Sequence, residues 1–297
     1  MSLVLTLIGN AATALSAAHA ETASAALPGA QSPVWLAPGL ACDIAFDAPE
    51  GESSASHVRK LRALFAGVAI DLAVQPITDR RKKLLVADMD STIIGQECID
   101  ELADHFGIGP RIAAITERAM RGEIDFEPAL RERVGLLRGL PLAALEEVYR
   151  DRITETPGGR ALIATMRAHG ATCALVSGGF TFFTERVSAA VGFDSHQANQ
   201  LVFRDGVLTG EVTDPILGRQ AKIEALVALR TQLGLSAAET MAVGDGANDL
   251  GMIAEAGLGV AFHAKPVVAE AAGARIDHGD LTALLYLQGY RQSEISA

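Results

Sequence analysis

A short apolar run at residues 84–87 leads directly into Asp88-Met89-Asp90-Ser91-Thr92. Buried strands seldom end on uncompensated charge, and aspartates two positions apart on an extended chain point to the same side. Two carboxylates that close repel each other, so a proton, a lysine or a metal ion must neutralise them. An Asp-x-Asp sequence alone is more often a solvated turn after a strand, so the rest of the chain decides its role.

Two further apolar runs end in the same manner. Residues 240–243 are followed by Gly244-Asp245-Gly246-Ala247-Asn248-Asp249, and residues 172–176 are followed by Ser177-Gly178-Gly179. Glycines allow the backbone to turn sharply and to approach a ligand. A serine hydroxyl beside backbone N–H groups suits a phosphoryl oxygen, although such a serine would also serve as a helix N-cap.

The expected strands alternate with helical patterns, which indicates parallel pairing and an α/β core. These strands are residues 84–87, 172–176, 240–243, 259–261 and 274–276. Parallel strands bring their carboxyl ends to one edge of the sheet, where such folds form ligand sites. With Lys222 nearby at the start of a helix, that edge would collect Asp88, Asp90, Ser177, Asp245 and Asp249. The aspartates make an oxygen-only shell that suits Mg²⁺.

About 80 residues separate Thr92 from Thr172, too many for a simple crossover between parallel strands. They have helical spacing and are interrupted at residues 107–110 and 139–141. This pattern predicts a helical cap over the site, at about residues 96–165. Residues 202–212, which turn at Arg204-Asp205-Gly206, are expected to form a small hairpin.

The N-terminal region has its own pattern. Strand-like runs at 3–8, 34–48 and 68–74 alternate with helical stretches at 11–27 and 57–65. The pattern predicts a small α+β module at residues 1–78, followed by the main domain at residues 79–297. It contains no reactive constellation, so a regulatory or dimerising role and a purely structural one are both open.

Composition narrows the class of protein. The 297 residues suit about two domains, and the net charge of −11 argues against a nucleic-acid partner. The basic run at residues 80–83 is expected to be a solvated linker. Three widely separated cysteines favour a reduced cytoplasmic protein. Residues 1–20 lack a basic start, which leaves a signal peptide as the minor alternative, and no apolar run is long enough for a membrane span.

Four features of the chain, taken in order, resemble the four motifs of the haloacid-dehalogenase (HAD) superfamily across residues 84 to about 280. They are residues 88–92, residues 177–179, Lys222 and residues 244–249. The resemblance implies a Rossmann-like core and the phosphatase branch, because dehalogenases lack the second aspartate. It implies that Asp88 attacks phosphorus and that Asp90 is the general acid and base. Asp88, the Asp90 carbonyl, Asp245 and Asp249 would hold Mg²⁺. The phosphate ligands would be Ser177, Gly178 and Lys222, with Asn248 orienting groups around the site.

Within the superfamily, the insertion resembles that of the phosphoserine phosphatase family. The matching segments are residues 95–100, 115–126 and 130–137. The resemblance implies an O-phosphoserine substrate and a place at the last step of serine biosynthesis. Glu97 would bind the substrate ammonium, Arg133 its carboxylate, and Met120 and Phe126 would form apolar walls. Less specifically, the N-terminal module resembles amino-acid-binding (ACT-like) regulatory domains, which would imply an amino-acid effector and a homodimer.

Alternatives remain at this point. Met120 and Phe126 would also fit a core, and Glu97 and Arg133 a surface ion pair. The same fold would serve a phosphatase or phosphotransferase acting on another small phosphorylated metabolite. A non-catalytic regulator is a further alternative, but a binding protein has no need of Asp90.

Overall fold

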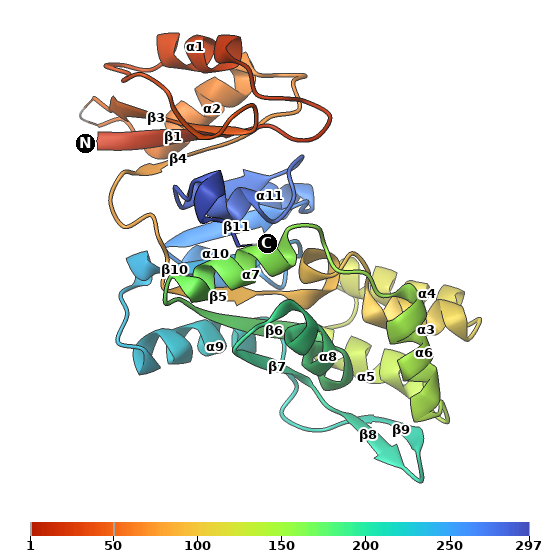
Figure 1. Cartoon of the computed structure of the whole chain (residues 1–297). Coiled ribbons are helices and arrows are strands. Elements are labelled where there is room, and N and C mark those ends of the chain that lie inside the picture. The colour runs from red at the N-terminus through yellow and green to blue at the C-terminus, as the bar shows by residue number, and fades with distance from the viewer. Residues whose placement is uncertain (1, 50, 297) are drawn as a thin grey trace.

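The computed structural model describes residues 2–49 and 51–296, which form a small N-terminal module and a larger α/β part (Figure 1). The module runs β1 (Ser2–Ile8), α1 (Ala17–Ala25), β2 (Val34–Ala37), β3 (Ala41–Asp47), α2 (Ser54–Leu64) and β4 (Asp71–Pro76). Its four strands lie in the order β2-β3-β1-β4, and every neighbouring pair is antiparallel. The expected α+β module is therefore confirmed. The strand-like run at 34–48 is two strands, because the chain turns at Gly39, whose φ is +73°.

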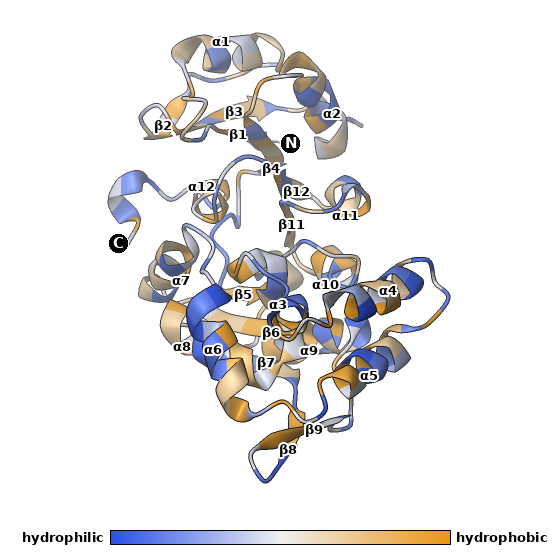
Figure 2. Ribbon diagram, turned by 90° about the vertical axis from the view of Figure 1, so that its right-hand side faces the viewer, coloured by the Kyte–Doolittle hydropathy of each residue, from blue (hydrophilic) through white to orange (hydrophobic). Residues whose placement is uncertain are grey.

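The module sheet is buried on both faces. Leu3, Leu5 and Leu7 of β1 pack with the module's own helices. On the opposite face, Ile8 and Ala73 belong to the same apolar cluster as the C-terminal part of the chain. Figures 1 and 2 show the module beside the C-terminal elements, on the side of the larger part that lies away from the hairpin of β8 (Leu201–Arg204) and β9 (Val207–Val212).

A six-stranded parallel sheet forms the centre of the larger part, in the order β12-β11-β10-β5-β6-β7. Its strands are β5 (Leu84–Ala87), β6 (Thr172–Phe180), β7 (Ser195–Asn199), β10 (Thr240–Gly244), β11 (Leu258–Phe262) and β12 (Ala274–Ile276). The five expected strands are present. The edge strand β7, Ser-His-Gln-Ala-Asn, was not predicted because it lacks the apolar run of its neighbours.

Helices cover this sheet and follow its strands. They are α7 (Gly159–Ala168), α8 (Thr181–Val191), α9 (Arg219–Gln232), α10 (Leu250–Glu255), α11 (Pro266–Ala271) and α12 (Ala283–Leu287), with short 3-10 turns at Ala237–Glu239 and Gln292–Glu294. Figure 2 shows hydrophobic residues along several strands of the central sheet and a mixture of hydrophobic and hydrophilic residues on the surrounding helices. Within the described residues, no helix is long and apolar enough to cross a membrane.

The long insertion is helical, as expected. A wide turn at Met89–Ile93 leads into α3 (Cys98–His105), α4 (Gly109–Met120), α5 (Phe126–Leu136) and α6 (Leu142–Arg152). The hairpin of β8 (Leu201–Arg204) and β9 (Val207–Val212) is also present, and β9 packs against α5. In Figure 1 the insertion lies to one side of the central sheet, and the hairpin lies at the end of the molecule opposite the module.

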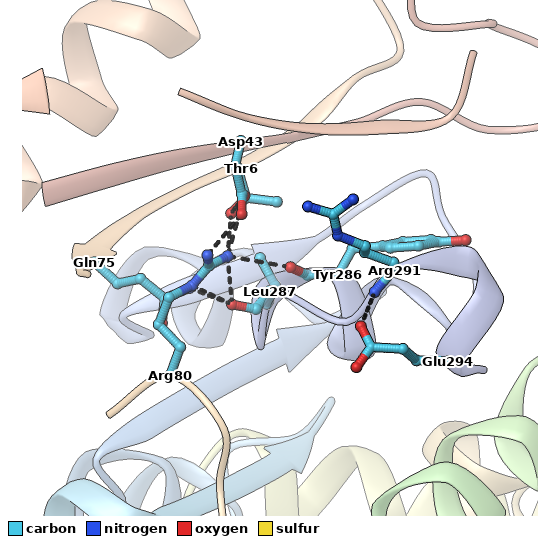
Figure 3. A network of polar contacts seen from close by, with 8 residues as sticks. All are labelled: Thr6, Asp43, Gln75, Arg80, Tyr286, Leu287, Arg291 and Glu294. Atoms are coloured by element: carbon cyan, nitrogen blue, oxygen red, sulfur yellow. Dashed lines mark hydrogen bonds and ion pairs between the residues drawn. The ribbon is translucent and has the colours of Figure 1, made fainter. Parts of the chain in front are cut away.

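The basic run after β4 is only in part the solvated linker that we expected: Arg81 and Lys83 are exposed, but Arg80 and Lys82 are not. The Arg80 guanidinium donates to both carboxylate oxygens of Asp43, at 2.6 and 3.0 Å, and to the Leu287 carbonyl (Figure 3). Both side chains of this ion pair are only 12% exposed. Lys82 is buried as well, and its ammonium donates to two backbone carbonyls. Charge density in the sequence indicated solvent, but these carbonyls and Asp43 satisfy the donors inside the protein.

Candidate active site

Three neighbouring strands bring the polar motifs together. Strand β5 lies between β6 and β10 in the parallel sheet. Asp88 follows β5 directly, Asp245 follows β10, and Ser177 lies in the last part of β6. The common edge expected from parallel pairing therefore exists, with α9 contacting β5 and β6.

Lys222 connects two of the carboxylates at this edge. Its ammonium lies 2.7 Å from Asp88 Oδ1 and 2.7 Å from Asp249 Oδ1, and the residue is only 1% exposed. Burial alone would lower the pKa of Lys222, but the charges of Asp88 and Asp249 raise it. Lys222 therefore stays protonated and holds a positive charge against Asp88.

One lysine does not balance the carboxylates around it. One oxygen each of Asp88, Asp245 and Asp249 lies within 4.8 Å of the others. Burial, followed by the charge of Asp88, raises the pKa of Asp245 to about 6 and that of Asp249 to about 7. Oxygen ligands at this spacing fit a hard divalent cation, which would compensate the excess negative charge. The residues therefore could hold a divalent metal.

Glycine is required behind this cluster. A Cβ atom on Gly244 would lie 2.4 Å from the Asp249 carboxyl group. Asp249 also accepts a hydrogen bond from the Gly246 backbone N–H at 3.0 Å, which fixes its second oxygen. Asn248 lies over the same loop, since its amide oxygen would be 2.3 Å from a Cβ on Gly246. The turn thus needs small residues to bring its polar side chains inward.

Asp90 has a different environment from Asp88, although only one residue separates them. Its carboxylate accepts a hydrogen bond from the Cys98 N–H at 3.1 Å and lies over Gly179, where a Cβ would be 2.7 Å away. No cation pairs with it among the described residues. Burial, then the charges of Glu97 and Asp88, raises the pKa of Asp90 to about 8. Its carboxylate is not part of the three-aspartate cluster.

Ser177 and Gly178 lie in the last part of β6, which another residue holds in place. Ser177 is buried, and its Oγ accepts from the Gly179 N–H at 2.9 Å. Asn199 is 2% exposed and donates to the carbonyls of Gly178, at 2.8 Å, and Leu217, at 3.1 Å. It also accepts from the Leu217 N–H at 2.7 Å. Asn199 therefore ties the end of β6 at Gly178 to the segment that enters α9. Sequence analysis missed it, because a lone asparagine carries no local signal.

The cap residues lie around this edge but are not all in contact. Glu97 immediately precedes α3 and accepts from the Ser91 hydroxyl at 2.8 Å. Arg133, on α5, is half-buried, which lowers its pKa, while the charges of Asp100 and Glu97 act in the opposite direction. No ion pair joins Glu97 to Arg133 in the described part of the chain.

The two apolar cap residues, Phe126 and Met120, differ in their contacts with the rest of the protein. The Phe126 ring packs on Gly178 and Gly218, where added Cβ atoms would lie 3.3 and 3.2 Å from it. Phe126 thus connects the cap directly to the Gly178 and Gly218 segments. Met120 is 71% exposed at the end of α4, so it is not a core residue. A cavity of about 760 Å³ lies between α5 and the start of α9, beside Phe126, and none of Asp88, Asp90, Asp245 and Asp249 lines it. The chemistry, rather than cavity size, therefore marks the site.

Comparison with known proteins agrees with this architecture. Residues 85–254 match the family of haloacid dehalogenase-like hydrolases. A phosphoserine phosphatase from a Polaromonas species is 45% identical over 226 residues, which cover 74% of this chain and 96% of that protein. The crystal structure of a HAD family hydrolase from Salmonella enterica is 32% identical, with a TM-score of 0.87, and the match covers 96% of this chain and 98% of that one. A substrate-bound phosphoserine phosphatase complex is 40% identical, with a TM-score of 0.65, over 69% of this chain and 97% of that one.

The chain therefore belongs to the haloacid dehalogenase-like hydrolases, a class of enzymes. Within that class it belongs to the phosphoserine phosphatase family. Both resemblances inferred from the motifs are thus confirmed, as is the α/β fold with its additional N-terminal antiparallel sheet.

Proposed function

We propose that this enzyme hydrolyses O-phospho-L-serine to L-serine and phosphate through an aspartyl-phosphate intermediate. The observation that carries the proposal is the difference between Asp88 and Asp90. Asp88 is paired with Lys222 at 2.7 Å, whereas Asp90 has no cationic partner in the described structure and a raised pKa. One carboxylate is thus suited to attack, and its neighbour is suited to carry a proton.

The proposed chemistry follows from those two environments. An Asp88 oxygen attacks phosphorus, the phosphorus–oxygen bond to serine breaks, and the Asp90 carboxyl gives its proton to the departing oxygen. Asp90, now a carboxylate, then takes a proton from the water that attacks the phosphoaspartate. Phosphate leaves and free Asp88 is restored. The pKa of about 8 allows Asp90 to do both near neutral pH.

We propose Mg²⁺ as the divalent metal, held by Asp88, Asp245 and Asp249 together with the Asp90 backbone carbonyl. The donor set is oxygen only, which is the chemistry that Mg²⁺ prefers. When bound, the ion would reduce the repulsion between the Asp88 carboxylate and an anionic phosphate. The glycines of the 244–249 turn keep the carboxylates close enough to share it.

Phosphate oxygens would be bound by the Ser177 hydroxyl, the Gly178 N–H and the Lys222 ammonium, with Asn248 orienting groups. Donors directed at equatorial oxygens stabilise the charge that develops there in phosphoryl transfer. Asn199 supports this arrangement indirectly, because its three hydrogen bonds hold the Gly178 and Leu217 segments together.

Serine recognition is assigned to the cap. Glu97 would pair with the substrate ammonium and Arg133 with its carboxylate, for which a guanidinium fork is well matched. Phe126 and Met120 would supply apolar walls that exclude water. The exposure of Met120 means that it reaches a ligand only if the cap closes.

The remaining assignments concern organisation. We propose residues 1–78 as a regulatory-type module and residues 79–297 as the phosphatase domain, with its cap at about 96–165. A homodimer, an amino-acid effector at the module and a cytoplasmic location in serine biosynthesis belong to the same proposal.

The test is steady-state hydrolysis of O-phospho-L-serine beside a panel of other phosphate monoesters, with Mg²⁺ and with EDTA. We expect the highest kcat/KM for phosphoserine and loss of turnover in EDTA. Preference for another metabolite over phosphoserine would overturn the proposed substrate. Transfer of the phosphoryl group to an added alcohol in place of water would make the enzyme a phosphotransferase. Size-exclusion chromatography with light scattering tests the dimer separately.

A further inference from the structure

A second cavity lies between the N-terminal module and the larger domain, away from the aspartate cluster. Its volume is about 170 Å³. We call it the junction pocket; its lining comes from the end of α2 and the following loop, the start of β4 and the end of β12, and includes Arg62, Phe65, Asp71, Arg275 and Asp277. None of the proposed catalytic or phosphate-binding residues takes part in it.

Arg62 is the unusual member of this lining. It is half-buried, yet its guanidinium has no hydrogen-bond or ion-pair partner within residues 2–49 and 51–296. Burial and the nearby charge of Arg275 both lower the pKa of Arg62, whereas Asp277 and Asp71 raise it. Partial burial removes some of the water that would otherwise accept from its donors, and an anion could take the place of that water. The pocket therefore contains a cation without a partner.

The acidic groups in the pocket already have partners. Asp71 accepts hydrogen bonds from the backbone N–H groups of Asp277 and Gly279, both at 2.7 Å, and from that of His278 at 3.2 Å. Asp277 pairs with Arg275 at 2.7 Å. Oxygens or nitrogens of Asp71, Asp277 and His278 lie close enough to share an ion, but binding one would displace these partners. Arg62 is therefore the charged group of this lining whose donors have no acceptor in the described structure, and a bound anion would supply one.

We propose that the junction pocket binds a small monocarboxylate, with the carboxylate held by the fork of Arg62 and reinforced by the charge of Arg275. A single negative charge balances Arg62, and planar carboxylates match a guanidinium in two parallel hydrogen bonds. A phosphate dianion fits less well, because it would bring two negative charges to a pocket that already contains Asp71 and Asp277, whereas a monocarboxylate brings one. The site is independent of the ester that the active site hydrolyses.

The size of the pocket restricts the ligand further. A water molecule occupies roughly 30 Å³ in the liquid, so 170 Å³ holds about six. Small hydroxy acids and small α-amino acids have about that many non-hydrogen atoms. The two sources share the carboxylate and differ in the ammonium group, for which the pocket offers the carboxylates of Asp71 and Asp277. L-Serine and glycolate therefore serve as probes of the two classes.

The experiment is hydrogen exchange of the full-length protein, titrated with L-serine, with glycolate or with inorganic phosphate. The informative amides are those of residues 277–279, because they donate to Asp71 at the pocket wall. A ligand bound at the active site would leave these amides unaffected, so the readout locates the binding. We expect slower exchange at residues 62–72 and 274–279 with at least one carboxylate probe.

Arg62→Gln removes the guanidinium fork. It should raise the ligand concentration that gives half-maximal protection by about tenfold or more. Arg59→Gln is the matched control, because Arg59 is exposed on the same helix and lies outside the pocket. Arg275→Gln is a second variant and should also weaken binding. Hydrolysis by these variants should match the wild type. Absence of protection by either carboxylate, protection by phosphate alone, or protection that survives in Arg62→Gln would overturn the proposal.

Discussion

Two buried ion-pair clusters in this protein resemble each other in composition and differ in balance. In the first cluster, which joins the module to the larger domain, Arg80 pairs with Asp43. The remaining Arg80 guanidinium donors reach Thr6 and backbone carbonyls (Figure 3). At the sheet edge, one lysine faces three aspartates, two of which have raised pKa values. Buried charges that satisfy one another contribute to structure, whereas an unbalanced set is suited to a metal and a substrate. The comparison predicts that substitutions in the two clusters will affect different properties.

The largest expected effect is at Asp88. Asp88→Asn keeps the shape but removes the nucleophile, so phosphoserine hydrolysis should fall about 10⁴-fold or more. The free energy of unfolding should stay the same or increase, because the substitution removes one of several repelling charges. Kinetics and urea unfolding of the same preparation test both. Substantial turnover by this variant would remove Asp88 from its role and weaken the contrast between the clusters.

The Arg80–Asp43 pair should show the reverse, a large effect on stability and a small effect on activity. Arg80→Ala leaves Asp43 buried without a cation, which typically costs about 3–5 kcal/mol in the free energy of unfolding. Activity of the folded variant on phosphoserine should change little. The double variant Arg80→Ala/Asp43→Ala is the control and should recover part of the loss, since neither charge is then isolated. Equal losses in single and double variants would mean that the pair is not coupled.

The aspartate cluster should also make the stability of the protein depend on pH and on Mg²⁺. Because the folded-state pKa values of Asp245 and Asp249 lie above 3.8, the ordinary value for an aspartate, protonation favours the folded state. In EDTA, stability from this source should be present below about pH 4 and decline as pH rises to about 7. Mg²⁺ at 100 times its dissociation constant should then restore about 2.7 kcal/mol at pH 7.5 and less at pH 5. Thermal unfolding at both pH values checks this. Asp245→Asn should reduce the pH dependence, and an unchanged slope would contradict the assignment.

The smallest effect concerns substrate choice. Arg133 has no ion-pair partner among the described residues, in contrast to Arg80. Arg133→Ala should lower kcat/KM for phosphoserine by about 10- to 100-fold, the value of a charge-assisted hydrogen bond, and should affect an aryl phosphate much less. Arg138→Ala, on the loop after α5, is a suitable control for removing a nearby cation. Equal losses on both substrates would assign Arg133 to structure.

Sequence alone predicted the elements with strong local patterns. Apolar runs that end in Asp88, Ser177 and Asp245 indicated parallel strands, and parallel pairing brings their ends together whatever the rest of the chain does. The four motifs and the cap segments were also sufficient to indicate the family. Strand β7 escaped notice because an edge strand of polar residues has no apolar signal.

Tertiary structure alone decided the pairings between distant residues. Arg80 meets Asp43, 37 positions away, and Asp71 caps amides more than 200 positions away. Asn199 acquires its importance from Gly178 and Leu217, which it joins. Local sequence patterns report burial and periodicity along one segment, and they carry no record of which side chain lies across from it. For this reason the sequence determined the carboxylates of the active site, whereas only the folded chain determined which charges are balanced and which remain available for ligands.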